Sequence, residues 1–204
     1  MTSPSADFRP LALVVWPHSG PAAAPAAIAR ALALALFGSL LLAVSAKVQV
    51  PFWPVPMTMQ TFVVLVLGAT YGWRLGVGTL IAYLAEGAAG LPVFAGTPEK
   101  GIGLAYMAGP TGGYLIGFVA AAALVGWLIE TGRAQGLLRL TLAMVLGHAA
   151  IFLAGISWLG ASIGLTKAVA VGLTPFWAAT ILKTALAVAT IAGLARLAHT
   201  RDRG

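Results

Sequence analysis

Cysteine is absent from this 204-residue sequence, and charged side chains make up only 8% of it. The lack of cysteine excludes disulfides, thiolate catalysis and cysteine-built metal sites. The scarcity of charge excludes an ordinary water-facing surface, because soluble domains carry roughly 25% charged residues. Since 60% of the residues are hydrophobic, the chain is predicted to be an integral membrane protein.

Motifs of the common enzyme classes are missing as well. The sequence contains no G-x-x-x-x-G-K-S/T phosphate loop and no H-E-x-x-H metal motif. His18, His148 and His199 are far apart, and His148 is interpreted as an interior histidine with satisfied hydrogen bonds. The chain is therefore predicted not to be an enzyme, to use no cofactor or metal, and not to hydrolyse ATP through a phosphate loop of its own.

The formal net charge is +7, and the basic residues fall between apolar runs. Because they do not cluster with exposed aromatic residues, nucleic-acid binding is not predicted, and the charge is interpreted as orienting the chain in a lipid bilayer. Residues 1–25 lack the order of a signal peptide and are predicted to form a flexible, Pro/Ala-rich tail. Residues 199–204 are predicted to form a basic C-terminal tail.

Apolar runs separated by proline, glycine and charge predict about six transmembrane helices. One crossing needs about 20 apolar residues, and lone strands cannot satisfy their backbone hydrogen bonds in lipid. We therefore expect a compact all-α bundle over residues 26–198. The predicted spans are 26–46, 57–71, 75–89, 110–129, 137–158 and 175–197.

The basic residues predict how these spans are oriented. With six spans, the side that holds both termini collects Arg9, Arg30, Arg74, Arg133, Arg139, Arg196, Arg201 and Arg203. The opposite side collects only Lys47, Lys100 and Lys167. Positive residues favour the cytoplasm, so both termini are predicted to be cytoplasmic in a multi-pass protein of the bacterial inner membrane. Any ligand would then enter from the outer face.

Lys183 falls about two turns into the last predicted span. A charged lysine at depth in lipid costs about 2.5–3.5 kcal/mol. It is expected either to snorkel to the interface or to face the interior and donate to a ligand carbonyl or carboxylate, with Thr180 on the same helix face. Glu86, near the outer end of the third span, is interpreted as an interfacial carboxylate, a partner of Lys183, a ligand acceptor or a carrier of protons. The residues alone leave these alternatives open.

The segment AGPTGGYLIGF opens the fourth span. A helix start favours an anionic group, and Gly112 and Gly113 let backbone N–H groups approach a ligand closely. Thr111, Gly112 and Gly113 are therefore candidate binding residues, although small residues also permit close helix packing. Tyr114 is interpreted either as a wall of the ligand pocket or as an interfacial aromatic residue.

The loop VPFWPVP is apolar although it lies outside the predicted spans. Trp53 is expected either to anchor at the membrane interface or to cover an apolar pocket. Gln60, just inside the second span, needs a polar partner in both cases.

The first span carries a ridge of small residues that repeats every four positions. Such a ridge permits close approach of another helix, from this chain or from a partner subunit. Its members are Ala31, Ala35, Ser39 and Ala43.

Three segments, PVPMTMQTFVVLVLGATYGWRLG, AGLPVFAG and GPTGGYLIGF, resemble the BioY family in their order and spacing, over roughly residues 30–195. These proteins are the biotin-specific S components of energy-coupling factor transporters. The resemblance implies a six-helix bundle that captures biotin from the outer side. It also implies a transmembrane coupling subunit, met by the ridge of the first helix, and cytoplasmic ATPase subunits that energise uptake.

The resemblance also assigns candidate binding residues. In the family, the sixth helix carries an Asp and, three residues later, a Lys, and both reach the ureido ring of biotin. Lys183 matches the Lys, whereas Thr180 stands at the Asp position, and Glu86 is a candidate for the missing acceptor. The family places an amide side chain where this chain has Gly96. Lys183 and Thr180 are thus expected at one polar end of the ligand, and the backbone of residues 111–113 at the other.

The sequence therefore predicts a high-affinity biotin-binding transport subunit whose uptake is energised by other chains. The alternative is a stand-alone proton-coupled carrier of biotin or a similar small carboxylate, with Glu86 or Lys183 titrating. An intramembrane enzyme is disfavoured because the sequence offers no paired nucleophile and base.

Overall fold

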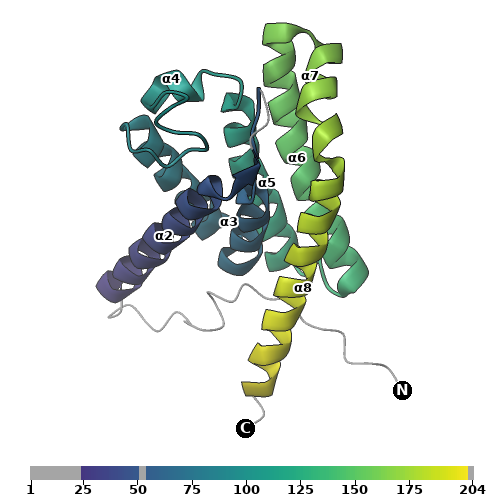
Figure 1. The fold of residues 1–204 in the computed structure, drawn as a ribbon. Coiled ribbons are helices and arrows are strands. Elements are labelled where there is room, and N and C mark those ends of the chain that lie inside the picture. The colour runs from purple at the N-terminus through teal and green to yellow at the C-terminus, as the bar shows by residue number, and fades with distance from the viewer. Residues whose placement is uncertain (1–23, 51–53, 202–204) are drawn as a thin grey trace.

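The computed structural model describes residues 24–50 and 54–201, most of which are helical (Figure 1). Five segments of this described chain are long and apolar enough to cross a membrane, as expected for an all-α membrane protein. In chain order the elements are α2 (Ala24–Lys47), β1 (Gln49–Val50), β2 (Met57–Thr58), α3 (Gln60–Ala88), α4 (Gly103–Met107), α5 (Gly112–Glu130), α6 (Leu137–Ile163), α7 (Leu165–Gly172), η2 (Thr174–Phe176) and α8 (Trp177–Arg201).

Helix α5 lies in the middle of the bundle, with α3 on one side and α6 on the other (Figure 1). Glycines set both contacts. A Cβ added at Gly68 of α3 would lie 2.9 Å from the Ala122 carbonyl oxygen of α5, and one at Gly117 of α5 would lie 2.7 Å from Ile151 Cα of α6. Because small residues let helix backbones approach closely in a membrane, these two glycines allow α5 to pack tightly against both neighbours.

Helix α3 reverses its direction at Gly72, and its two halves lie side by side. Gly72 has φ +78° and ψ 174°, a non-helical conformation that glycine adopts readily. The Gln60 Nε2 donates to the Tyr83 hydroxyl at 2.7 Å although 23 positions separate the two residues. In a straight helix their Cα atoms would be about 34 Å apart. The reversal falls between the two spans predicted at 57–71 and 75–89.

The Glu130 side chain, at the end of α5, is hydrogen-bonded to the turn at which α3 reverses. Glu130 Oε1 accepts a hydrogen bond from the Trp73 backbone N–H at 3.0 Å. The first N–H groups of a helix have no partner within it, and a negative charge beside them is favourable. Glu130 therefore caps the second half of α3 and ties the turn to the end of the central helix.

Several predicted boundaries are corrected by the structure. The connection around Lys167 was expected to be a loop, but it forms α7, and the connection before the fourth span contains α4. The fifth span continues to Ile163, and the last begins at Trp177, behind η2. Helix α8 extends to Arg201, so half of the predicted C-terminal tail is helical. The predicted tail of residues 1–25 lies outside the described residues apart from the start of α2.

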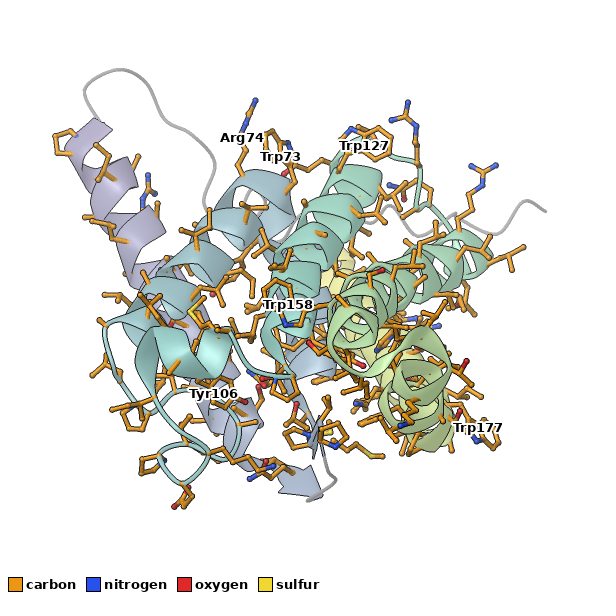
Figure 2. The ribbon with its side chains drawn as sticks, turned by 90° about the horizontal axis from the view of Figure 1, so that it is seen from above. Trp73, Arg74, Tyr106, Trp127, Trp158 and Trp177 are labelled. Carbon is orange, nitrogen blue, oxygen red and sulfur yellow. The ribbon has the colours of Figure 1, made fainter. Side chains whose placement is uncertain are left out.

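Aromatic residues mark two opposite sides of the molecule (Figure 2). Trp73, Arg74 and Trp127 lie along one edge, whereas Trp177 lies toward the other. The guanidinium carbon of Arg74 is 5.1 Å from the centre of the Trp73 ring. Tryptophan and basic residues are typical of membrane–water interfaces, so this edge has the composition of such an interface.

Candidate functional site

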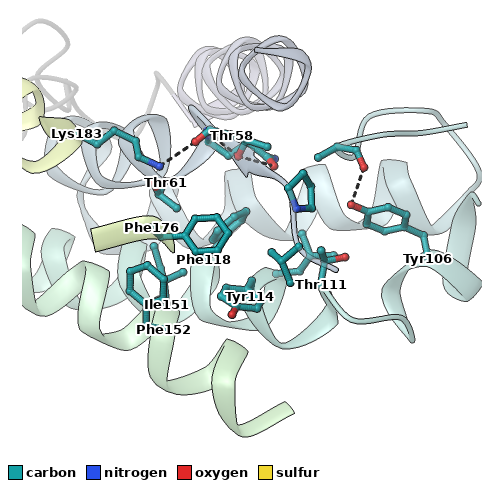
Figure 3. A pocket seen from close by; sticks show the side chains of 15 residues that line it. Thr58, Thr61, Tyr106, Thr111, Tyr114, Phe118, Ile151, Phe152, Phe176 and Lys183 are labelled. Atoms are coloured by element: carbon teal, nitrogen blue, oxygen red, sulfur yellow. Dashed lines mark hydrogen bonds between the residues drawn. The ribbon is translucent and has the colours of Figure 1, made fainter. Parts of the chain in front are cut away.

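A cavity opens between α3, α5, α6 and α8, beside the segments that precede α3 and α5 (Figure 3). It encloses about 540 Å³ of space not filled by protein atoms, open mouth included. The lining residues are Val55, Pro56, Thr58, Gln60, Thr61, Ala95, Tyr106, Thr111, Tyr114, Leu115, Phe118, Ile151, Phe152, Phe176 and Lys183.

Lys183 forms one polar end of the cavity. Its side chain is only 6% exposed, and its Nζ donates a hydrogen bond to the Thr58 carbonyl oxygen at 3.0 Å. An ammonium group has three protons to donate. Lys183 thus reaches the cavity from α8 and retains donor capacity for a ligand there.

The turn that leads into α3 supplies further polar groups at this end. The Thr58 hydroxyl accepts the Gln60 backbone N–H at 3.2 Å and donates to Gln60 Oε1 at 3.4 Å. Gln60 Nε2 donates to the Tyr83 hydroxyl, which donates in turn to the Val93 carbonyl oxygen at 3.0 Å. The prediction that Gln60 needs a polar partner is met by this chain of hydrogen bonds.

The middle of the cavity is apolar. Phe118 of α5, Ile151 and Phe152 of α6, and Phe176 of η2 surround it (Figure 3). The ring of Tyr114 completes this wall, and its hydroxyl donates to the Gly172 carbonyl oxygen at 2.9 Å. Tyr114 is therefore a pocket wall that also holds the end of α7, rather than an interfacial aromatic residue.

Tyr106 and Thr111 form the second polar end (Figure 3). The Tyr106 hydroxyl donates to the Ala95 carbonyl oxygen at 2.8 Å. Burial raises the pKa of Tyr106, and a hydrogen bond with Thr111 lowers it in part, so the phenol is neutral and remains a donor at physiological pH. Thr111 precedes the first residue of α5, where the helix dipole favours an anionic group.

Lys47, at the end of α2, fixes the wall segment that carries Ala95. Its Nζ donates to the Phe94 and Thr97 carbonyl oxygens at 3.1 and 2.9 Å, and to the Thr97 hydroxyl at 3.2 Å. The Phe94 ring stacks on Tyr106 with centroids 5.0 Å apart. The connection between the spans predicted at 75–89 and 110–129 is thus attached both to the first helix and to the cavity lining.

Four of the predicted site residues line the cavity, and five do not. Lys183, Gln60, Thr111 and Tyr114 are in the lining. Gly112 and Gly113 instead permit close packing, because a Cβ at Gly112 would lie 2.0 Å from the Met107 carbonyl oxygen and one at Gly113 would lie 2.2 Å from Trp158 Cβ. Gly96, Thr180 and Glu86 also stand outside the lining. Trp53 lies outside the described residues.

Glu86 has a partner other than the one considered from the sequence. Its Oε2 accepts a hydrogen bond from the Ser39 hydroxyl of α2, whereas the Lys183 ammonium is bonded to Thr58. Two of the interpretations of Glu86, as partner of Lys183 and as direct ligand acceptor in this cavity, do not fit these positions. Its carboxylate instead joins α2 to α3.

The small-residue ridge of α2 faces the bundle along part of its length. Ser39 is 1% exposed, and Ala35 and Ala43 are half-buried, whereas Ala31 is exposed. A neighbouring face of the helix exposes Leu32, Leu36 and Leu40. A partner interface at the ridge therefore remains a prediction, and Ser39 is engaged within the chain.

Sequence reasoning missed the aromatic wall and three polar lining residues, Thr58, Thr61 and Tyr106. Phe118 and Phe152 lie in long apolar spans in which no periodic signal separates pocket-facing from lipid-facing positions. Thr61 follows Gln60 directly in the segment PVPMTMQTF, and nothing in that segment distinguished its hydroxyl as a lining group. Tyr106 belongs to a segment that was expected to be loop, where burial is not predictable from pattern. The signal that could have identified Thr61 is its position next to Gln60, a polar residue that was already a candidate.

Comparison with known proteins places the chain in a family. The BioY family profile matches residues 18–200. The probable biotin transporter BioY of Pyrococcus horikoshii is 38% identical over 155 residues, 76% of this chain and 89% of that protein. The biotin transporter BioY of Thermotoga maritima is 36% identical over 137 residues, 67% of this chain and 78% of that protein.

A solved structure has the same fold. The crystal structure of the S-component for biotin from an ECF-type ABC transporter matches with a TM-score of 0.72 and 22% identity, over 82% of this chain and 92% of that chain. The sequence motifs and these relatives agree. This chain belongs to the BioY family.

Proposed function

We propose that this protein is the membrane-embedded, biotin-capturing subunit of a vitamin uptake system. The observation that carries the proposal is the cavity with an apolar middle and a polar group at each end, one of them the buried ammonium of Lys183. Biotin has a matching layout, with a ureido ring, an apolar thioether ring and chain, and a carboxylate. Relatives that bear the name biotin transporter support the choice of ligand.

Each end of the cavity suits one end of biotin. Lys183 would donate to the ureido carbonyl oxygen at its end of the cavity. The carboxylate would lie near Thr111 and Tyr106, which supply hydroxyl groups beside the start of α5, a helix end that favours anions. The phenyl rings between them would bury the apolar part of the ligand, which is the usual division of roles in small-molecule sites.

The chain would cross the membrane six times and be energised in trans. The reversal of α3 at Gly72 supports two crossings within this helix, and the edge with Trp73 and Arg74 supports cytoplasmic termini. A transmembrane coupling subunit and ATPase subunits would then drive uptake across the bacterial inner membrane, with contact through α2. The S-component nature of the solved structural relative supports this assignment.

Equilibrium binding to purified protein tests the proposal. We expect saturable binding of radiolabelled biotin at submicromolar concentration. Lys183→Met should weaken it roughly a hundredfold, because a charge-assisted hydrogen bond is lost at a desolvated site. Lys167→Met is the matched control, since Lys167 is exposed on α7, and its affinity should equal that of the wild type. Absence of submicromolar binding by the wild-type protein would contradict the proposal.

Transport measurements separate a subunit from a stand-alone carrier. In liposomes that contain this chain alone, a proton gradient should not drive biotin accumulation, because Glu86 is bonded to Ser39 and lies outside the cavity lining. Accumulation should require co-reconstituted coupling and ATPase subunits with ATP. Gradient-driven accumulation by the single chain would instead favour the proton-coupled carrier.

A further inference from the structure

Thr61, in the first turn of α3, carries the hydroxyl with unused hydrogen-bonding capacity at the Lys183 end of the cavity. Its Oγ1 is buried from solvent and has no hydrogen-bond partner among residues 24–50 and 54–201. The residue belongs to the cavity lining, and Figure 3 shows it beside the Lys183 side chain. A buried polar atom without a partner is costly in a folded protein, so this hydroxyl calls for an explanation.

The neighbouring polar groups are already engaged with one another. The Thr58 hydroxyl accepts from the Gln60 N–H and donates to Gln60 Oε1. Gln60 Nε2 donates to Tyr83. The Thr58 carbonyl oxygen accepts from Lys183. A ligand that enters this end therefore meets an ammonium group, which can only donate, and the Thr61 oxygen, which can accept.

We propose that Thr61 Oγ1 accepts a hydrogen bond from one ureido N–H of biotin while Lys183 donates to the ureido oxygen. The inference rests on the proposed function and assigns a specificity-determining residue within it. A ureido group presents a carbonyl acceptor flanked by N–H donors, so it needs a donor and an acceptor side by side. Thr180 does not line the cavity, and Glu86 is bonded to Ser39, which leaves Thr61 as the side chain suited to this role.

Replacement of Thr61 by valine keeps the shape of the side chain and removes the hydroxyl. Thr61→Val should bind biotin about tenfold more weakly, the usual effect of one neutral hydrogen bond at a buried site, and Thr61→Ser should restore most of the affinity. Thr70→Val is the matched control on the same helix. Its hydroxyl donates to the Val66 carbonyl oxygen and lies outside the lining, so its affinity should be unchanged.

Biotin analogues methylated at one or the other ureido nitrogen separate direct contact from a structural effect. Wild-type protein should bind at least one of them more weakly than biotin. In Thr61→Val the penalty for that methylation should fall by about tenfold, because the two changes remove the same hydrogen bond. Unchanged biotin affinity in Thr61→Val, or an undiminished methylation penalty in it, would overturn the inference. Failure of wild-type protein to bind biotin would instead reject the proposed function.

Discussion

Lys183 combines burial with few partners, which is an unusual state for a lysine. The side chain is 6% exposed, and among the described residues its ammonium makes one hydrogen bond, to the Thr58 carbonyl oxygen. A charge taken out of water is costly unless it is fully paired. We interpret this costly burial as serving ligand binding, because Lys183 lines the cavity and its ammonium can donate to a ligand there.

This argument predicts opposite effects of one substitution on stability and binding. Lys183→Met replaces a buried cation by an apolar chain of similar length, so the ligand-free protein should gain about 1 kcal/mol or more in stability. The measurement is thermal unfolding of the detergent-solubilised protein in the absence of biotin. Biotin should raise the unfolding temperature of the wild-type protein and leave that of the variant almost unchanged. A variant that unfolds at a lower temperature without ligand would contradict the argument.

Lys47 acts at a distance from the ligand, through the wall segment of residues 94–97. Lys47→Met removes three hydrogen bonds to Phe94 and Thr97, and Ala95 between them lines the cavity. Biotin should therefore dissociate about three- to tenfold faster, as measured by chase with unlabelled biotin. Lys100→Met, an exposed neighbour on the same loop, should dissociate at the wild-type rate. Equal rates for all three proteins would show that the attachment does not control release.

At the scale of elements, glycine in α5 has a packing role that can be measured. A Cβ at Gly113 would lie 2.2 Å from Trp158 Cβ and 2.5 Å from the Ala154 carbonyl oxygen, so α5 and α6 must separate in Gly113→Ala. We expect a loss of about 1–3 kcal/mol in stability. Gly78→Ala is the control, because nothing lies within 4 Å of a Cβ there, and it should stabilise α3 by up to about 1 kcal/mol. Thermal unfolding of both variants tests this difference.

A weaker biotin affinity in Gly113→Ala without loss of stability would contradict the packing assignment. That outcome would return Gly113 to the role expected from the sequence, a backbone position close to the ligand. The same pair of measurements on Gly112→Ala, where the added Cβ would meet the Met107 carbonyl oxygen at 2.0 Å, extends the test to the neighbouring position.

The sequence predicted the elements well wherever hydropathy changed abruptly. The reversal at Gly72 was expected because the segment GWRLG breaks two apolar runs. Helix α7 was missed because its length of 8 residues is too short for a span, and Lys167 within it had been interpreted as a loop residue. Burial is a property of packing between distant elements, so hydropathy could identify α3 and α6 but not which of their residues face the cavity.

The candidate site was predicted only where a polar residue stood out in an apolar span. Lys183 and Gln60 were found for that reason, and the cavity contains both. Glu86 stood out equally, but its partner Ser39 is 47 positions away in the sequence, and nothing local signals such a pair. Thr180 was assigned by its helical spacing from Lys183 and by the resemblance to the family, and neither signal shows how far along α8 the cavity extends.

At the scale of the whole molecule, the reversal of α3 determines how many times the chain crosses the membrane. The absence of cysteine makes the topology directly testable, because each introduced cysteine is the sole target of a thiol reagent. Val48 and Lys100 flank α3 and are exposed, whereas Arg74 lies just behind the turn at Gly72. If both halves of α3 cross the bilayer, Val48 and Lys100 lie outside and Arg74 lies inside.

Intact cells that carry single-cysteine variants should therefore give a three-part labelling pattern with a membrane-impermeant maleimide. Val48→Cys and Lys100→Cys should be labelled at once. Arg74→Cys should be labelled only after permeabilisation, as should Arg133→Cys in the turn after α5, since arginine-rich connections favour the cytoplasm. The decisive comparison is Val48 with Lys100, because a helix that crosses once would expose them on opposite sides. Labelling of both from outside, with Arg74 protected, requires that the chain enters and leaves the bilayer within α3.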